Sequence, residues 1–229
     1  MKCRADFVLN PKAMVKIIVT KPHHLTTVAR CHLVAFPHSL ATALGKAYVT
    51  KMLSWYLSTE KTFLFHIENE EGKCIGYCGG LISDGSLGTG SASGMAQYTF
   101  KAAIWAFFLH PWVLFHPEVR KKWPLLWRNI KMKLGFAKRN HFTPEQKTKM
   151  ACDPAVGLVV IGVDPVYQGK GYGSILLQEF ERKAVEEYGI KKLRLSVLSD
   201  NTQAIRAYER NGWIRGEVKG RSLGMWKYV

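Results

Sequence analysis

Three glycines separate an apolar run from an amphipathic segment in the C-terminal half of the chain. The run AVGLVVIGVD (155–164) is almost wholly apolar, which predicts a strand buried on both faces. Pro165 follows it, and QGKGYGS (168–174) then leads into SILLQEFERKAVEEY (174–188), which has helical periodicity. A buried strand that enters a helix through a glycine turn predicts an α/β fold.

The glycine turn has the chemistry of an anion site. The first turn of a helix carries unsatisfied N–H groups and the positive end of the helix dipole. Without side chains at Gly169, Gly171 and Gly173, these groups can approach an anion closely, and Lys170 adds a positive charge. The turn therefore predicts a phosphate or pyrophosphate site. A tight structural turn, in which Gly173 lets the helix pack closely on the strand, is the alternative.

Two common nucleotide-binding loops do not fit this turn. A P-loop has Ser or Thr after its lysine, whereas Gly171 follows Lys170. The Rossmann fingerprint G-x-G-x-x-G does not match GKGYG. Glu187 lies near the distance at which that fold has an acidic residue, but inside the predicted helix rather than at the tip of the next strand.

The turn resembles the acyl-CoA-binding motif of the GCN5-related N-acetyltransferases (GNAT), Q/R-x-x-G-x-G/A, with Gln168, Gly171 and Gly173 at its fixed positions. A second segment, NTQAIRAYERNGW (201–213), is similar to that family's N-x-x-A-x-x-x-Y-x-x-x-G-F pattern, with Trp213 in place of Phe. The two motifs follow in the family's order with one predicted strand between them. The chain is therefore identified as a member of this superfamily, on a resemblance that is clear from Val156 to the C-terminus.

The resemblance implies an acetyl-CoA site. In this family the fourth and fifth strands splay apart, and the pantetheine arm lies in the gap against backbone that corresponds to residues 160–163. The implied cofactor-binding residues are Ile161, Gly162, Val163, Gln168, Gly169, Lys170, Gly171, Tyr172, Gly173, Ser174, Asn201, Ala204 and Tyr208. The N–H groups from Gln168 to Ser174 would hold the pyrophosphate. Asn201 would hydrogen-bond the pantetheine, and Ala204 would leave room for it.

The resemblance also implies direct attack of an amine on the thioester. Tyr208 has the position of the general acid that protonates the leaving thiolate, and an N–H near Gly162 or Val163 would stabilise the oxyanion. For Tyr208, a purely structural role in packing the last helix on the sheet is the alternative.

The general base is not defined by a motif. Many members of the family have a Glu on the fourth strand, but residues 155–163 contain no ionisable side chain. His66, with Glu68 on the same predicted strand, is our candidate; a water molecule, His110 or His116 remains open. The histidines and cysteines lack the spacing of metal ligands, so no metal site is expected.

The rest of the chain predicts a mixed central sheet flanked by helices. The predicted strands are 13–22, 62–68, 74–82, 155–164, 192–199, 213–223 and 224–229. The predicted helices are 23–36, 39–58 with Ser39 as its cap, 174–188 and 201–211. Gly72 supplies the turn between the second and third strands.

Residues 85–154 form an insertion between the third and fourth strands of one domain that spans residues 1–229. We expect this insertion to be mostly helical. Its apolar part, 102–115, is shorter than the roughly twenty residues that span a bilayer. Ten Lys and Arg and two Glu lie between residues 118 and 149, and four of the seven Trp lie in the insertion.

Two uses of the insertion remain open. Apolar side chains, Trp and Lys or Arg together are typical of a surface that rests on anionic lipid. The alternative is a packed lid or a homodimer surface with a solvated basic face. The formal charge of +16 also suits nucleic acid, but no nucleic-acid-binding motif accompanies it. In either use the insertion is expected to shape the acceptor pocket.

The sequence therefore predicts an acetyl-CoA-dependent N-acetyltransferase that acts on a primary amine. A nucleotide-linked or lipid-linked amino sugar is the favoured acceptor, because basic surroundings suit a phosphorylated substrate. A protein or peptide amine and a polyamine remain open, although positive charge would repel a polyamine. The alternative from another class is a catalytically silent CoA-binding or membrane-docking module.

The five cysteines are scattered and form no C-x-x-C pair, and the N-terminus lacks the long apolar block of a signal peptide. We therefore expect a cytoplasmic protein, peripheral at the inner face of the membrane if the insertion contacts lipid.

Overall fold

The computed structural model describes residues 8–9, 15–83, 92–120 and 153–229 of the 229-residue chain. Within these residues, eight strands form one mixed sheet in the order β1-β2-β3-β4-β5-β6-β8-β7. The strands are β1 (Val8–Leu9), β2 (Lys16–Val19), β3 (Thr62–Glu68), β4 (Cys74–Ser83), β5 (Ala155–Val163), β6 (Lys192–Leu198), β7 (Ile214–Lys219) and β8 (Ser222–Tyr228). The expected α/β fold is confirmed.

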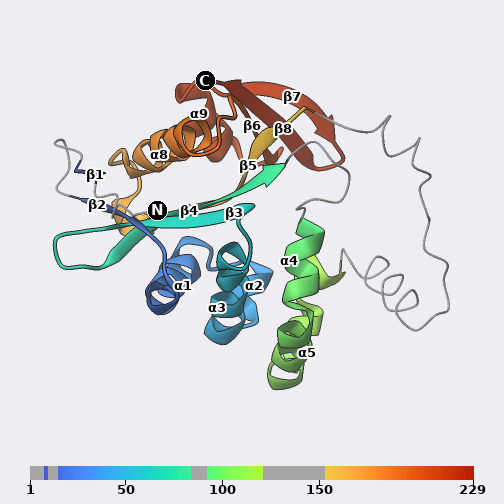
Figure 1. Cartoon of the computed structure of the whole chain (residues 1–229). Helices are drawn as coiled ribbons and strands as arrows, with labels where there is room; N and C mark the ends of the chain where they lie inside the picture. The colour runs from blue at the N-terminus through green and yellow to red at the C-terminus, as the bar shows by residue number, and fades with distance from the viewer. Residues whose placement is uncertain (1–7, 10–14, 84–91, 121–152) are drawn as a thin grey trace.

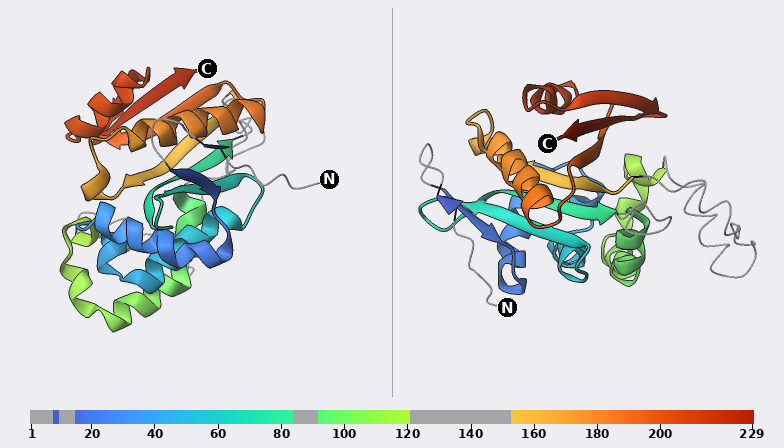
Figure 2. Two further views of the ribbon diagram at one scale, coloured as in Figure 1. Left: turned by 90° about the vertical axis from the view of Figure 1, so that its left-hand side faces the viewer. Right: turned by 45° about the horizontal axis from the view of Figure 1, so that its top comes forward.

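Helices cover both faces of the sheet, with α8 and α9 on one face and α1 to α3 on the other (Figure 1). The α-helices are α1 (Leu25–Ala35), α2 (Leu40–Ala43), α3 (Lys46–Ser54), α4 (Ala92–Tyr98), α5 (Phe100–Leu109), α8 (Tyr172–Glu186) and α9 (Thr202–Arg210). Short 3₁₀ helices are η1 (Pro22–His24), η2 (Trp55–Leu57), η3 (Pro111–Phe115) and η4 (Pro165–Tyr167). Both views of Figure 2 show α4 and α5, in green, beside the blue helices.

A separate hydrophobic core lies on each face of the sheet. Phe65, Leu176 and Phe180 belong to the core under α8. Val28 and Tyr77 belong to the core under α1 and α3. The alternating burial along β6 follows from the two-residue repeat of a strand, which sends every second side chain into the α8 core.

The predicted helix over residues 39–58 is wrong as a single helix. Gly45 adopts a φ of +91°, a conformation that favours glycine, and it separates α2 from α3. The predicted cap is confirmed, because the Ser39 hydroxyl accepts a hydrogen bond from Thr42 N at 3.2 Å. His110 of the insertion lies against Gly45, with Nε2 3.3 Å from the position that a Cβ would occupy.

The closing hairpin turns earlier than predicted. β7 ends at Lys219 and β8 begins at Ser222, with Gly220 at a φ of +62° between them. The turn at Gly72, with a φ of +72°, is confirmed.

The described part of the insertion, residues 92–120, is helical, as expected. The basic stretch 121–149 and the glycine-rich stretch 85–91 lie outside the described residues. None of the helices within the described ranges is long and apolar enough to cross a bilayer.

Candidate active site

Strands β5 and β6 form a fork. They are the parallel neighbours in the sheet, and they pair only where residues 156–158 of β5 face residues 193–195 of β6. Beyond Leu158 and Leu195 no pairing joins the two strands, although β5 continues to Val163 and β6 to Leu198. The facing edges therefore carry backbone groups that the sheet does not use.

A bulge in β5 marks the point where the fork opens. Gly79 of β4 faces Val160 and the next residue, Gly80, faces Leu158, so Val159 is an extra residue in β5. A bulge bends its strand and increases the local twist, which turns the end of β5 away from β6.

A groove of about 220 Å³ fills the fork. It is lined by Phe36, Leu158, Val159, Val160, Ile161, Leu195, Ser196, Val197, Leu198 and Tyr208. The expectation that the whole of β5 is buried on both faces is therefore wrong, because its second half forms a groove wall and Val159 is 39% exposed.

The groove connects the two faces of the sheet. Phe36 at the end of α1 packs with the core under α1 and α3, whereas Tyr208 on α9 packs with the core under α8. The groove is therefore lined by residues from both faces of the sheet.

The direction of the backbone along β5 identifies which N–H groups face the fork. Asp164 N donates to Ile75 O of β4 at 2.9 Å, and N–H groups alternate in direction along a strand. The N–H groups of Ile161 and Val163 therefore point toward the fork and that of Gly162 toward β4. Of the two oxyanion donors expected from the sequence, the geometry favours Val163 over Gly162.

The glycine turn leaves a row of backbone donors open at the start of α8. Gly169 and Gly171 have φ values of +75° and +89°, and a Cβ added at Gly169, Gly171 or Gly173 would meet no atom within 4 Å. Close packing of the helix on the strand therefore does not explain Gly173. Among the described residues, no backbone hydrogen bond uses the N–H groups of residues 169 to 173.

The N–H groups at the two ends of the predicted row have acceptors within the loop. Gln168 N donates to Pro165 O at 3.3 Å and Ser174 N to Gly171 O at 3.0 Å, because these residues belong to the turns that shape the loop. The Gln168 side chain donates from Nε2 to Val163 O at 3.0 Å and so attaches the loop to the end of β5.

Two lysines flank this loop. Lys170 Nζ lies 5.3 Å from the centre of the Tyr167 ring and Lys73 Nζ lies 5.6 Å from it. Lys73 also pairs with Asp164 at 3.2 Å, and this hydrogen-bonded carboxylate raises the pKa of Lys73. Lys73, which comes from the β3–β4 turn, was not among the residues predicted from the sequence. The Tyr172 ring meets that of Tyr167 edge-on at 6.0 Å.

Asn201 caps α9. Its Oδ1 accepts a hydrogen bond from Ala204 N at 3.1 Å, which leaves its amide N–H groups to donate. Ala204 packs on the core under α8 and is not one of the residues that line the groove.

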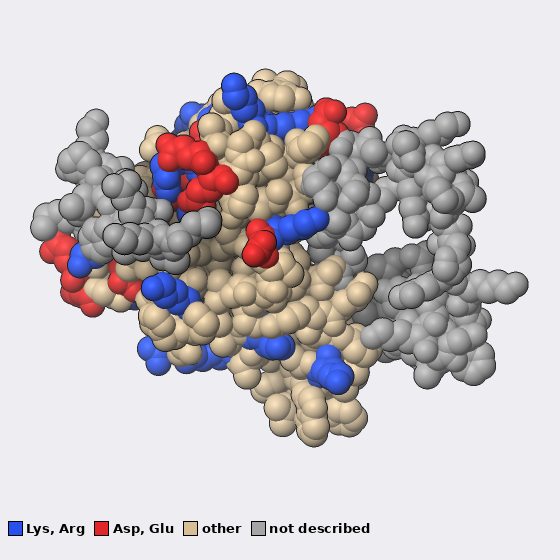
Figure 3. Space-filling model, viewed as in Figure 1, with Lys and Arg blue, Asp and Glu red and all other residues tan. Residues whose placement is uncertain are grey.

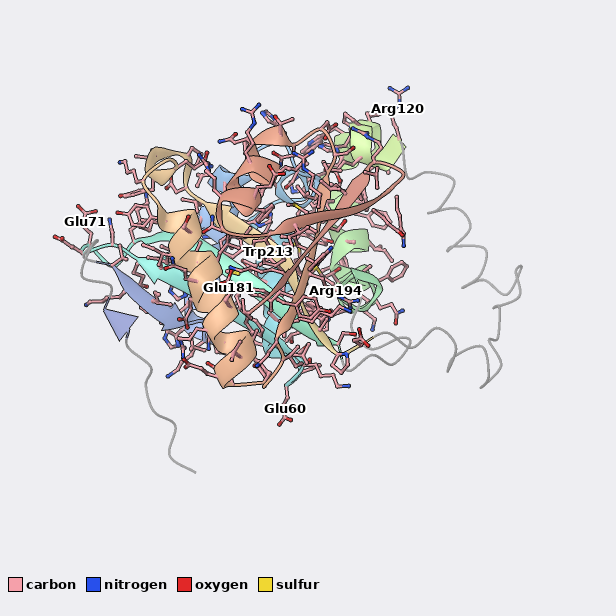
Figure 4. All side chains as sticks on the ribbon, turned by 90° about the horizontal axis from the view of Figure 1, so that it is seen from above. Glu60, Glu71, Arg120, Glu181, Arg194 and Trp213 are labelled. Atoms are coloured by element: carbon pink, nitrogen blue, oxygen red, sulfur yellow. The ribbon has the colours of Figure 1, made fainter. Side chains whose placement is uncertain are left out.

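Among the described residues that line the groove, Tyr208 has the one ionisable side chain. Trp213 lies between α8 and α9 (Figure 4), with its ring 6.4 Å from that of Phe180 and 6.1 Å from that of Tyr208. Burial raises the pKa of Tyr208 to about 12, since a buried phenolate is poorly solvated. At neutral pH the side chain is therefore a phenol with a proton to donate.

The structure places His66 away from the groove. His66 is fully buried in β3, with Nδ1 2.9 Å from Thr20 Oγ1 and Nε2 3.2 Å from Glu68 Oε1. β4 lies between β3 and β5, so His66 and β5 are separated by two strand spacings of about 4.8 Å each. The structure thus does not bring His66 together with Tyr208. The Glu68 carboxylate is hydrogen-bonded to His66.

The two histidines of the insertion do not line the groove either. His110 stacks edge-on against Trp112 at 4.9 Å, beside Gly45. His116 Nδ1 accepts a hydrogen bond from Glu118 N at 3.3 Å. Neither contact places a ring nitrogen in the fork.

A buried histidine does lie beside the fork. A Cβ on Gly162 would come within 2.8 Å of Phe36 and 2.9 Å of Tyr77. The Tyr77 hydroxyl lies 2.5 Å from His32 Nδ1. Burial lowers the pKa of His32 from 6.5 to about 4, so this pair is uncharged at neutral pH.

We expect His32 to make the folded protein less stable in acid. Because its pKa is lower in the folded state, its contribution is fully present above pH 6.5 and is lost as the pH falls toward about 4. The shift corresponds to about 3 kcal/mol at most. Denaturant unfolding of His32→Gln should show a weaker loss of stability over this range than the wild type. The exposed His38→Gln is the control; equal pH dependence in all three proteins would contradict the assignment.

The fork between β5 and β6 and the open N–H groups at the start of α8 are two features that the resemblance to the N-acetyltransferases predicts. Residues 134–213 match the family described as Acetyltransferase (GNAT) family. This match covers about a third of the chain and includes the glycine turn, Asn201 and Tyr208.

Two curated relatives match a short part of the chain. They are the "Spermine/spermidine N(1)-acetyltransferase" of Bacillus subtilis strain 168 and the "Probable spermine N(1)-acetyltransferase" of Bacillus subtilis subsp. natto. Each is 39% identical over 57 residues, which are 24% of this chain and 38% of the relative. The chain therefore matches well under half of the length of these relatives.

Solved structures share the fold over most of the chain. The PaiA N-acetyltransferase of Thermoplasma acidophilum, in complex with coenzyme A, has a TM-score of 0.50 and 14% identity, and the alignment covers 94% of this chain and 99% of that one. PH1933 of Pyrococcus horikoshii has a TM-score of 0.53 and 15% identity, with 94% and 98% covered. At these identities the likeness concerns the fold.

Proposed function

We propose that this protein transfers an acetyl group from acetyl-CoA to a primary amine. The fork is the observation that carries the proposal, because it places an unused strand edge, an open groove and a row of free N–H groups along one path. A coenzyme A molecule needs such a path for its pantetheine arm and its pyrophosphate.

The donor would lie along β5. Of the two N–H groups that face the fork, that of Ile161 would pair with an amide of the pantetheine arm, as a further strand would, and that of Val163 would be left for the oxyanion. The N–H groups of residues 169 to 173 would hold the pyrophosphate at the start of α8, with Lys170 and Lys73 beside it. The amide of Asn201 would donate to the arm from the other side of the fork.

The chemistry is a direct displacement at the thioester. The amine nitrogen attacks the carbonyl carbon, and a β5 N–H that faces the fork stabilises the oxyanion. The C–S bond then breaks, Tyr208 donates its proton to the thiolate, and the products are an N-acetyl amine and the free thiol of CoA. The acceptor ammonium loses one proton to water before it attacks, and its nitrogen loses a second proton to water after the C–N bond forms, because no carboxylate or imidazole lines the groove among the described residues. Water then returns a proton to Tyr208.

For the acceptor, we propose an amine on an uncharged or phosphorylated molecule, such as an amino sugar linked to a nucleotide or a lipid. The described residues that line the groove include no carboxylate. The helices on its acceptor side, residues 20–58 and 92–120, contain one carboxylate, Glu118. The Bacillus subtilis relatives are named for spermine and spermidine, but a polycation would find few counter-charges here.

A thiol-release assay tests both the reaction and the acceptor. With acetyl-CoA as donor, we expect a nucleotide-linked amino sugar or an amino-sugar phosphate to give a kcat/KM at least about ten-fold above that of spermidine, a difference of about 1.4 kcal/mol. A free peptide N-terminus serves as the third class of acceptor.

The possible results separate the parts of the proposal. If spermidine is the best acceptor, the acceptor assignment is wrong and acetyl transfer stands. If calorimetry shows acetyl-CoA binding but no amine releases thiol, the catalytically silent alternative is favoured. If acetyl-CoA does not bind, the proposed function fails.

A further inference from the structure

The described part of the insertion carries an apolar surface that points away from the domain. Trp105, Phe108, Leu109, Trp112 and Phe115 have exposed fractions of 63–79%, and we call these five residues the apolar tip. Trp105, Phe108 and Leu109 follow the spacing i, i+3 and i+4 and so share one side of α5, whereas Trp112 and Phe115 lie in η3, which follows α5 after His110. Large exposed patches of this kind mark interaction sites.

The other side of the same segment is fixed to the domain. Ala106, Val113 and Val119 are buried in a small core together with Leu44 from the end of α2. Figure 1 shows α5 at the lower edge of the molecule, next to α3. The apolar tip is therefore held on a folded platform and projects from it.

The platform that holds the apolar tip is positively charged. Residues 15–59 contain no Asp or Glu. The helical layer formed by residues 20–58 and 92–120 contains six basic residues and one carboxylate, Glu118, whose Oε1 accepts a hydrogen bond from Leu40 N at 3.2 Å. The six are Lys21, Arg30, Lys46, Lys51, Lys101 and Arg120.

The figures show the same distribution of charge. In Figure 3, the charged side chains on the lowest, helical part of the molecule are Lys and Arg, whereas Lys, Arg, Asp and Glu lie together over the rest of that face. Arg120 points outward at the end of the described insertion (Figure 4).

We propose that the apolar tip docks this protein onto an anionic lipid bilayer. Tryptophan and phenylalanine beside Lys and Arg are typical of helices that lie in the interface of a membrane. α5 has ten residues and a length of about 15 Å, so it would lie in the interface rather than cross the bilayer. Lipid can accommodate the projecting apolar tip without the complementary surface that a protein partner would need. The basic layer around the tip complements anionic headgroups.

Vesicle binding by the full 229-residue chain tests this proposal independently of acetyl transfer. We compare vesicles of phosphatidylcholine with vesicles in which part of this lipid is replaced by phosphatidylglycerol. The wild type should float with the anionic vesicles, bind less at high salt, and show a blue shift of tryptophan emission. The triple variant Trp105→Ser, Phe108→Ser, Trp112→Ser should lose at least about ten-fold in partition.

Two charge variants test the basic layer, and a matched control tests whether the loss of any exposed apolar side chains weakens vesicle binding. Lys101→Gln and Arg120→Gln should each weaken binding to anionic vesicles by about five-fold, the effect of one basic residue near such a surface. The matched control replaces Ile214 and Trp226 by Ser, because these side chains are exposed on the closing hairpin, at 50% and 38%. The control should bind vesicles as the wild type does, and melting temperatures establish that every variant is folded.

A wild type that stays free of both kinds of vesicle overturns the proposal. If light scattering then shows a dimer that the triple variant no longer forms, the tip is a contact between two copies of this chain. Equal loss of vesicle binding in the triple variant and in the control also overturns the assignment to the tip.

Discussion

Replacing Gly171 by Glu is expected to reduce acetyl-CoA binding by at least about 100-fold. The open N–H groups of residues 169 to 173 surround the position that the pyrophosphate would take. A carboxylate within about 4 Å of a phosphate charge costs up to about 4 kcal/mol near a protein surface. Calorimetric titration of acetyl-CoA into the wild type and the variant measures the effect.

Gly189→Glu is the matched control for this substitution. Gly171 and Gly189 both have positive φ values, +89° and +66°, and a Cβ at either position meets no atom within 4 Å. Both variants therefore introduce the same charge and a similar backbone strain of about 1–2 kcal/mol. Gly189 lies beyond the other end of α8, so its variant should bind acetyl-CoA normally. If Gly171→Glu binds acetyl-CoA as the wild type does, the pyrophosphate does not bind at the start of α8.

Replacing Tyr208 by Phe is expected to lower kcat by about 10²- to 10⁴-fold, the range for loss of a general acid. Binding of acetyl-CoA should stay within about two-fold of the wild type, because the phenyl ring keeps its contacts with Trp213. Single-turnover acetylation and calorimetry separate these two quantities.

The pH dependence gives a second test of Tyr208. Its pKa of about 12 lies above the ordinary value of 10, so the phenol keeps its proton up to about pH 12. Rates of the wild type should therefore not fall between pH 8 and 10 through loss of this proton. Tyr188→Phe, which removes a hydroxyl from the same core cluster outside the groove, should leave kcat unchanged. If Tyr208→Phe keeps a normal kcat, the tyrosine has the packing role instead.

Local signals in the sequence were sufficient for much of the fold. The cap at Ser39, the turn at Gly72 and the start of α8 all depend on residues that are close together in the chain. Helical and strand periodicity likewise reflects which face of one element is buried. The break at Gly45 was missed because the helical pattern continues on both sides of it.

The features that the sequence did not predict depend on contacts between distant segments. The exposure of Val159 follows from how far β5 pairs with β6, which no pattern within β5 records. Lys73 meets the loop at Lys170 through the β3–β4 turn, almost a hundred positions away in the chain. His66 looked like a candidate base because the sequence did not show that Thr20 lies against it.

The short contact between β5 and β6 also has a mechanical consequence. Only three residue pairs join the five strands on one side of the sheet, β1 to β5, to the three strands on the other, among the described residues. The core under α8 extends across this seam, whereas the core on the opposite face includes no residue of β6, β7 or β8 in the part of the chain that the structure describes. The sheet therefore consists of two groups of strands, β1 to β5 and β6 to β8, which the core under α8 joins on one face and few contacts join on the other. A thioester donor bound between β5 and β6 would contact both groups of strands and hold them in a fixed position. The donor would therefore have to bind before the site could bind an acceptor firmly.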